Sequence, residues 1–410
     1  MRKTRVLAMV MAGGAGGRME LLTEERAKPV LPFAGVYRLI DFPLSNCLHS
    51  GLSDVWIVEQ FHPQSLTDHV SNGRPWDLDR TYGGMRLLHP HLGTEQSGFH
   101  EGNADAIYRN QAVVRDFDPD VLVVMSADHV YKLDFNKPIE RHLERDAQVT
   151  MVTTAVKRDD PTRFGLVEVD GDGRVTEYCY KPDHPFGDIA ATEIFIFDAH
   201  SLLDHLENLA GREGGQEEPS LEDLGDDVLP ELVGEGRVFE YRLDGYWRDV
   251  GTIDSYWRAH MELLSPEPEL DLDDPGWPIL TLGGQRPAAH ILESARSDNS
   301  LVSSGCKVAG TVVNSVLGRG VIVEAGAQVR NSVLLHDSVI ERGATVETAI
   351  VDAGARIGSG AMVGAASGPP SDEGEGTGIS PEHITLVGID ASVAADERVE
   401  RGGRVGGTRS

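Results

Sequence analysis

The sequence predicts an α/β domain with a mostly parallel sheet, followed by a β-helix built from hexapeptide repeats. Two observations lead to this prediction. Up to about residue 262, short apolar runs alternate with helical or loop stretches, and beyond residue 300 the sequence repeats with a fixed period. A chain of 410 residues is long enough for two or three domains with large buried cores.

The first part contains short runs that are apolar on successive residues, which is typical of strands covered on both faces. These runs span residues 6–12, 55–59, 121–126, 149–156 and 193–197. Strands of this kind form mostly parallel sheets with helices on both sides. We expect a nucleotide or sugar site at their carboxyl ends.

The second part contains three units that begin 17 residues apart, at Asn314, Asn331 and Thr348. Glycines fall at the same phase of each unit, and apolar residues recur six positions apart, at Val323/Val329, Val333/Val339, Ile340/Val346 and Ile357/Val363. This spacing is typical of coils of three short strands whose apolar side chains point inward. An ordinary antiparallel β-domain would alternate without a fixed period.

Composition places the domain boundaries. Proline and glycine crowd residues 266–287, which favours an irregular connector. We therefore expect the α/β domain over 1–262, a linker over 263–298, the β-helix over 299–395 and a flexible tail over 396–410. Residues 368–376 are expected to be flexible too, because they can bury little apolar area.

The chain is strongly acidic, with 37 Lys and Arg against 66 Asp and Glu, a net charge of −29. This charge disfavours nucleic acids and anionic membranes as partners. Three widely spaced cysteines without a CxxC pair argue against a disulfide framework and favour a reducing cytoplasm. The apolar run near the first residue is only seven residues long and leads into glycines, so we expect a buried strand there.

A glycine-rich loop, MAGGAGGRM over residues 11–19, directly follows that first strand. Glycines let backbone N–H groups approach a phosphate closely, and Arg18 adds a fixed cation. Arg26 and Lys28 place two more cations nearby. The spacing matches neither GxxxxGK[ST] nor GxGxxG, which disfavours a P-loop NTPase and a dinucleotide-binding domain.

Four separated motifs now occur in one order: GGAGGRM (13–19), ERAKPVLPFAG (25–35), RLIDFPLSNCLHSG (38–51) and YWRDVGT (246–252). In this order they resemble the bacterial ADP-glucose pyrophosphorylase family, the glucose-1-phosphate adenylyltransferases of glycogen synthesis, over nearly the whole chain. The resemblance implies a Rossmann-like nucleotidyltransferase domain followed by a left-handed parallel β-helix. It also implies a homotetramer that uses ATP, a sugar 1-phosphate and Mg²⁺.

The resemblance assigns the triphosphate to Arg18 and Lys28, and the main catalytic acid to Asp128 at the end of a buried strand. Asp128 and Asp249 would bind Mg²⁺, which proteins typically hold with one or two carboxylates, phosphate oxygens and waters. The residues implied to contact the nucleotide are Ala12, Gly13, Gly14, Gly16, Gln60, Gly102, Ala104 and Asp105. The residues implied to contact the sugar phosphate are His100, Gly165, Tyr180, Lys181 and Ala191.

Each assignment has a structural alternative. In these alternatives, Asp128 only caps a turn, Asp249 pairs with Arg248, and Lys181 is a solvated lysine at a strand end.

The chain departs from the family mainly around the sugar. Tyr180 stands where the family has a glutamate, Ala191 replaces a serine, and His100 replaces a tyrosine. A glutamate accepts charge-assisted hydrogen bonds from sugar hydroxyls, and a tyrosine does not offer the same pair of acceptors. Another hexose 1-phosphate or another nucleoside triphosphate is therefore an alternative to glucose 1-phosphate and ATP.

Regulation is also expected to differ. Glu25 replaces a lysine that enteric members use for an activating sugar bisphosphate, whereas Arg26 and Arg38 match other effector contacts and would bind anionic metabolites. In so acidic a chain, these arginines could instead form structural ion pairs.

Two other functions and one other assembly stay open. The changes at Ala15, Tyr180 and Ala191 would suit a weakly active regulatory subunit of the same family. A hexapeptide-repeat acyltransferase would need a histidine in the coils, and His336 is the candidate between residues 314 and 364. A monomer capped by its own apolar patch at 384–389 is the alternative to the homotetramer.

Overall fold

The computed structural model describes residues 4–90, 99–156, 160–212, 221–364 and 379–407. The predicted flexible stretch at 368–376 lies outside these residues. The chain forms two compact units that are interleaved in sequence. The first comprises residues 1–14 and 42–247, and the second comprises residues 15–41 and 248–410.

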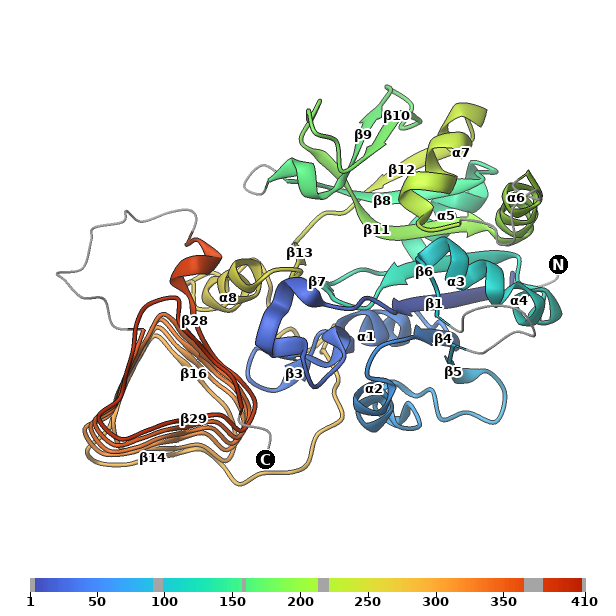
Figure 1. Cartoon of the computed structure of the whole chain (residues 1–410). Helices are drawn as coiled ribbons and strands as arrows, with labels where there is room; N and C mark the ends of the chain where they lie inside the picture. Colours follow the sequence, from blue (N-terminus) through green and yellow to red (C-terminus); the bar gives the residue numbers. More distant parts are fainter. Residues whose placement is uncertain (1–3, 91–98, 157–159, 213–220, 365–378, 408–410) are drawn as a thin grey trace. The chain divides into compact units, whose positions relative to one another are not determined.

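The first unit is built on a nine-stranded mixed sheet (Figure 1). Its strands are β1 (Val6–Ala12), β4 (Asp54–Glu59), β5 (Gly84–Leu88), β6 (Val121–Ser126), β8 (Val149–Ala155), β9 (Gly165–Val169), β10 (Val175–Tyr180), β11 (Ile189–Asp198) and β12 (Val238–Arg242). The short strand β7 (His129–Tyr131) lies outside this sheet. The helices are α1 (Asp41–His49), α2 (Pro63–Val70), α3 (Asn103–Arg109), α4 (Gln111–Phe117), α5 (Asn136–Glu144), α6 (Ala199–Arg212) and α7 (Leu229–Glu235), with short turns η3 (Arg74–Trp76), η4 (Pro161–Arg163) and η5 (Leu224–Val228).

The predicted α/β class is confirmed, but the sheet is less parallel than expected. The order is β10-β9-β11-β6-β1-β4-β5, and β8 joins β11 to β12. Strands β5, β4, β1 and β6 are parallel, as are β8 and β12, whereas β11 runs antiparallel to β6, β8 and β9. An apolar run marks a doubly covered strand but does not fix its direction.

One face of the sheet packs against helices α3, α4, α6 and α7. Side chains from the strands, such as Met9, Val124 and Phe197, form one apolar cluster with side chains from these helices, such as Ile107, Leu206 and Leu232. Burial of this apolar surface is the main stabilising contribution to the unit.

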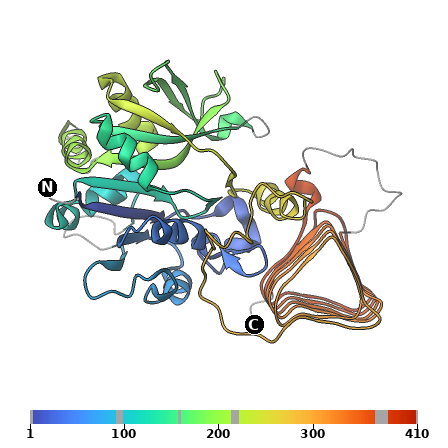
Figure 2. The same ribbon diagram turned by 180° about the vertical axis from the view of Figure 1, so that it is seen from behind.

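The second unit contains a β-helix of three parallel six-stranded sheets, seen from the other side in Figure 2. The first sheet is β14 (His290–Ile291), β17 (Lys307–Val308), β20 (Ile322–Val323), β23 (Val339–Ile340), β26 (Arg356–Ile357) and β29 (Ser392–Val393). The second is β15 (Arg296–Asp298), β18 (Thr311–Val313), β21 (Gln328–Arg330), β24 (Thr345–Glu347), β27 (Met362–Val363) and β30 (Arg398–Val399). The third is β16 (Leu301–Val302), β19 (Val316–Leu317), β22 (Val333–Leu334), β25 (Ala349–Val351), β28 (Thr385–Val387) and β31 (Arg404–Val405).

The sixfold apolar spacing places one inward-facing column of side chains on each sheet. Register aligns Val308, Val323, Ile340, Ile357 and Val393 on the first sheet, and all are buried. Columns through Val329 and Val346, and through Leu334 and Val351, complete the core. This is the arrangement of the β-helix that the hexapeptide period predicts, and it is consistent with the left-handed β-helix that the resemblance implies. Val333 and Val339 do not belong to this core, because their neighbours Leu334 and Ile340 point inward.

The β-helix is longer than the sequence indicates. Its strands run from His290 to Val405, so they include residues assigned to the linker and to the flexible tail. The predicted cap at 384–389 instead supplies β28, a strand between β25 and β31. Val351 pairs with Val387, 36 residues further along the chain, and this insertion hides the 17-residue period from sequence inspection.

Part of the predicted first domain packs with the second unit. Residues 15–41 belong to the second unit and form η1 (Gly17–Thr23), η2 (Lys28–Val30), β2 (Pro32–Phe33) and β3 (Tyr37–Arg38). The unit also includes α8 (Ile253–Glu262), most of β13 (Trp247–Asp249) and η6 (Pro381–His383). The Tyr256 hydroxyl of α8 donates to the Pro32 carbonyl, and the Trp257 indole donates to the Asn331 carbonyl at 2.9 Å.

No helix in the described part of the chain is long and apolar enough to cross a bilayer.

His260 anchors residues 15–41 through a neutral imidazole. Its Nδ1–H donates to the Tyr256 carbonyl at 2.8 Å, and its Nε2 accepts from the Ala34 N–H at 3.2 Å. Burial lowers the pKa of His260 to about 4, an effect that the hydrogen bond to Tyr256 only partly opposes. A depressed histidine pKa stabilises the fold fully above the unfolded value of about 6.5, and this contribution falls as pH drops towards 4.

We therefore predict that His260→Gln reduces the loss of unfolding free energy between pH 7 and pH 4.5, by up to about 3 kcal/mol, since each pKa unit is worth about 1.4 kcal/mol. Urea titrations at the two pH values measure this loss. The exposed His290→Gln serves as the matched control and keeps the wild-type pH dependence. An equal pH dependence in both variants contradicts the assignment.

Candidate functional site

The predicted site edge is present in the first unit, where the parallel strands β1, β4 and β6 end together. Register pairs Ala12 with Glu59 and Met11 with Ser126, so the carboxyl ends of the three strands are level. Gly13 follows β1 at this edge, and a side chain at Gly13 would contact Gln60 at 3.7 Å. The structure therefore brings together the start of the glycine loop, Gln60 and the segment that carries Asp128.

Gln60 is used to fix the neighbouring segment. Its Nε2 donates to the His100 carbonyl at 3.0 Å, and its Oε1 accepts from the His100 N–H at 2.6 Å. Gly102 then passes so close to the Glu222 carbonyl that an added Cβ would lie 2.0 Å from that oxygen. Only glycine fits at this position. Close packing therefore explains why Gly102, which is predicted to contact the nucleotide, is a glycine.

Ala104 and Asp105 begin α3 and are both buried. The Asp105 carboxylate accepts from the Glu101 N–H at 3.0 Å and pairs with Arg109 Nε at 2.7 Å. These bonds order the start of α3, so Asp105 shapes the edge of the site through the backbone.

Asp128 follows β6 directly and its side chain is 19% exposed. Its Oδ1 accepts a hydrogen bond from the Ser126 hydroxyl and lies 3.7 Å from His129 Nε2. The imidazole of His129 is buried, and its Nδ1–H donates to the Thr192 carbonyl at 3.1 Å. Asp128 is thus held at the strand end with its carboxylate still reachable.

The predicted sugar-phosphate residues lie on β9 and β10 and just after them. A Cβ at Gly165 would lie 2.6 Å from the Tyr178 hydroxyl, so Gly165 lets Tyr178 cross the neighbouring strand. Lys181 Nζ donates to the Tyr180 hydroxyl at 2.6 Å and lies 4.1 Å from the centre of the Tyr180 ring. Lys181 is therefore oriented by Tyr180 and is not a lysine surrounded only by solvent.

Ala191, also predicted to contact the sugar phosphate, lies on β11. Its side chain is buried in the apolar cluster between the sheet and α3, α6 and α7. It supplies packing, which explains why a small apolar residue is tolerated there.

Sequence reasoning missed three side chains beside Asp128: His129, Glu193 and Trp247. The Trp247 ring lies 5.1 Å from the His129 ring and 5.5 Å from the Phe164 ring, in edge-on geometry. Glu193 Oε2 lies 3.8 Å from His129 Nε2. A charged residue inside the otherwise apolar run 189–197 is the signal that points to Glu193.

The remaining predicted residues belong to the second unit. Arg18 is exposed in η1, Lys28 is buried at the start of η2, and Asp249 ends β13 next to Gly251. Arg248, the residue before Asp249, pairs with Glu262 at 2.5 Å.

The two candidate effector arginines contact the β-helix. Arg26 forms an ion pair with the fully buried Asp352, and Arg38 Nη1 contacts His336 Nε2. Burial, together with the neighbouring Arg26, lowers the pKa of Arg38 to about 10. Arg26 therefore makes the structural ion pair that the sequence left open.

His336 is unsuited to general-base catalysis. Its Nδ1 accepts from the Arg319 N–H at 3.2 Å, and burial with the nearby Arg38 lowers its pKa to about 3. So weak a base does not favour the acyltransferase alternative.

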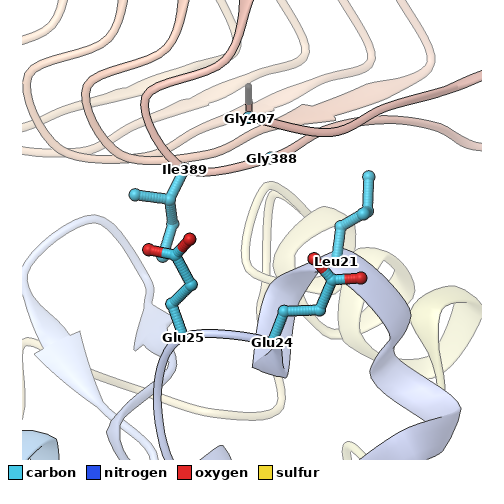
Figure 3. A pocket seen from close by; sticks show the side chains of 6 residues that line it. All are labelled: Leu21, Glu24, Glu25, Gly388, Ile389 and Gly407. Atoms are coloured by element: carbon cyan, nitrogen blue, oxygen red, sulfur yellow. The ribbon is translucent and has the colours of Figure 1, made fainter. Parts of the chain in front are cut away.

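The second unit contains a cavity of about 270 Å³ (Figure 3). Its lining is formed by Leu21, Glu24, Glu25, Gly388, Ile389 and Gly407. Figure 3 shows both glutamate side chains extending towards the Gly388–Ile389 backbone. Glu25 thus adds negative charge to this cavity.

Among the described residues, no group of three or more His, Cys, Asp or Glu side chains is arranged to hold a metal ion. Mg²⁺ commonly takes only one or two carboxylates and completes its octahedron with waters and substrate phosphates. A reachable carboxylate at a strand end, as at Asp128, has the donor chemistry that Mg²⁺ prefers.

Comparison with known proteins identifies the chain. The nucleotidyl transferase family model matches residues 7–266, and the model of a GlmU-like, C-terminal hexapeptide region matches residues 287–387. The glucose-1-phosphate adenylyltransferase of Clostridium beijerinckii is 40% identical over 331 residues, covering 80% of this chain and 84% of that protein. The enzyme of the same name from Thermomicrobium roseum is 45% identical over 304 residues, covering 74% and 70%.

Thermotoga maritima has a further relative of that name, 40% identical over 326 residues, with 79% of this chain and 76% of that protein covered. The resemblance inferred from the motifs is confirmed. The chain belongs to the glucose-1-phosphate adenylyltransferase family of nucleotidyl transferases.

Proposed function

We propose that the protein transfers the adenylyl group of ATP to glucose 1-phosphate, giving ADP-glucose and pyrophosphate for glycogen or α-glucan synthesis. The observation that carries the proposal is the position of Asp128, at the end of β6 and level with the glycine loop after β1. The names of the curated relatives support the choice of glucose 1-phosphate and ATP.

In this reaction a phosphate oxygen of the sugar phosphate attacks the α-phosphorus of ATP, and the bond to the pyrophosphate oxygen breaks. No covalent intermediate on the protein is needed, so catalysis consists of in-line positioning and charge neutralisation. Arg18 and Lys28 hold the triphosphate, and Lys181 holds the sugar phosphate. The contact of Lys181 with Tyr180 fixes the ammonium group before the substrate arrives.

Asp128 and Asp249 would hold Mg²⁺, which neutralises phosphate charge when bound. Ser126 and His129 position Asp128 by contacting its Oδ1.

The proposal also covers the effectors, the assembly and the cellular compartment of the protein. Anionic metabolites act as effectors at Arg38, where the neighbouring arginines enrich the positive charge. The chain assembles as a homotetramer, which the exposed Ile291 and Leu292 at the first coil of the β-helix support. Three free cysteines fit a reducing cytoplasm.

Asp128→Asn is predicted to lower turnover by orders of magnitude, because the metal loses a charged ligand while the side-chain volume is kept. Pyrophosphate release from ATP and glucose 1-phosphate measures the effect. The exposed Asp172→Asn is the matched control and keeps wild-type turnover. Near-normal turnover in Asp128→Asn would contradict the assignment of Asp128 as a metal ligand.

The wild-type protein is assayed in parallel with several sugar 1-phosphates and nucleoside triphosphates. ATP with glucose 1-phosphate should be among the best pairs. A poor rate with this pair and a high rate with another would transfer the proposal to that substrate. Slow turnover with every pair would favour the regulatory-subunit alternative.

Arg38→Ala is predicted to abolish the response to anionic metabolites, so that the ratio of rates with and without a metabolite falls to about one. Phosphorylated sugars, inorganic phosphate and small carboxylic acids are the probes. Arg330→Ala, on an exposed part of β21, is the control and keeps the response. Loss of the rate without any metabolite would place Arg38 in structure or catalysis instead.

Light scattering at micromolar concentration tests the assembly. A homotetramer of the 44.5 kDa chain has a mass of about 178 kDa. A mass of one chain across a dilution series would exclude the tetramer under those conditions.

A further inference from the structure

Glu193 occupies an unusual backbone position in the middle of β11. Its φ is 54°, in the left-handed region that L-residues other than glycine, asparagine and aspartate rarely adopt. The pairing of β11 with β8 is irregular here: Ala191 pairs with Thr153 and Phe195 pairs with Met151, so four steps on β11 face two steps on β8. Bulges of this kind often lie beside active sites, where they redirect a side chain.

The backbone before Glu193 is held firmly in this conformation. The buried Thr192 donates its hydroxyl to the Val152 carbonyl at 2.9 Å, and its own carbonyl accepts from His129 Nδ1 at 3.1 Å. The surrounding structure thus maintains an unfavourable backbone angle at a charged residue. Strain that is retained in this way is a reason to look for a function.

The Glu193 carboxylate lies on the Asp128 side of the sheet edge. Its Oε2 is 3.8 Å from His129 Nε2, and the same nitrogen is 3.7 Å from Asp128 Oδ1. The side chain is 46% exposed, so a ligand can reach it. The distance to His129 is too long for a hydrogen bond.

The sugar-phosphate residues lie close to the same carboxylate. The pKa of the Tyr178 phenol is raised by burial first, and then by the nearby Tyr180 and Glu193. The Tyr178 hydroxyl lies against Gly165, and Tyr180 holds Lys181. Glu193, Tyr178, Tyr180 and Lys181 therefore belong to one neighbourhood of the first unit.

Tyr180 is not available as a substitute for the missing glutamate. Its hydroxyl accepts from Lys181 Nζ, and its ring packs so closely on Gly225 that an added Cβ there would lie 2.6 Å from the ring. A tyrosine in this place contacts Lys181 but offers the sugar hydroxyls no carboxylate acceptor at position 180.

We propose that Glu193 binds the hydroxyl groups of the hexose whose phosphate Lys181 holds, supplying from β11 the carboxylate that Tyr180 does not supply from β10. A carboxylate offers two oxygen acceptors, and its hydrogen bonds to hydroxyls are stronger than those between neutral groups. Glu193 is thus a specificity-determining residue for the sugar substrate. The inference rests on the proposed function, because it presupposes a hexose 1-phosphate at Lys181.

The first test separates sugar binding from folding. Glu193→Gln and Glu193→Gly should raise KM for glucose 1-phosphate about tenfold or more, while KM for ATP changes less than about twofold. Glu193→Gly should also keep or raise the melting temperature, because glycine adopts this φ without strain. Glu177→Gln, on the exposed part of β10, is the matched control and keeps both KM values.

The second test identifies the hydroxyl. Wild-type and Glu193→Gln proteins are compared on glucose 1-phosphate and on its 2-, 3-, 4- and 6-deoxy analogues. Removing the contacted hydroxyl should cost the wild-type protein about tenfold or more in kcat/KM and cost the variant little.

Two results overturn the inference. One is an unchanged KM for glucose 1-phosphate in both Glu193 variants of an active enzyme, and the other is an equal penalty for every deoxy analogue in wild-type and variant proteins. Failure of the proposed function looks different, because the wild-type protein would then release no pyrophosphate from ATP with any hexose 1-phosphate.

Discussion

The ion pair between Arg26 and Asp352 is the constraint on which the arrangement of the second unit depends. Asp352 lies in the β-helix and its side chain is fully buried, while the Arg26 side chain is 11% exposed. Two buried charges are tolerated only as a pair, because removing either partner leaves the other uncompensated. The pair ties residues 15–41 to the β-helix, two positions away from Lys28, the residue proposed to hold the triphosphate. The β-helix therefore anchors this N-terminal segment as well as its own coils.

Hydrogen bonds from α8 reinforce this attachment. Tyr256 and His260 bind the backbone at Pro32 and Ala34, so the residues after Lys28 are held from a second side. In the first unit, a hydrogen bond from Ser126 holds Asp128 in a similar way, and His129 lies beside the same carboxylate oxygen. Preorganised charged groups of this kind are what phosphoryl-group chemistry needs, since little covalent work falls to the protein.

The chain departs from the family mainly at residues predicted to contact the sugar, and it keeps Lys181, the residue proposed to hold the sugar phosphate. Tyr180 replaces a carboxylate but contacts Lys181, and Ala191 has become part of the core. The nearby carboxylate comes from Glu193, on a bulge that antiparallel pairing with β8 creates. A substitution in one strand is therefore best interpreted together with the other strands of the sheet, because β10 and β11 are separated by β9 and still bring side chains into one neighbourhood.

The sequence alone determined the fold class, the repeat architecture and the family, because these depend on local patterns. Val323 and Ile340 reveal the β-helix through their spacing, and the glycine loop and YWRDVGT reveal the family through their order. Tertiary structure decided the rest. Arg26 meets Asp352 326 residues away, Glu193 meets His129 through a bulge, and β31 joins β28 after an interrupted repeat. These features depend on which distant residues become neighbours when the chain folds, and local spacing carries no information about that.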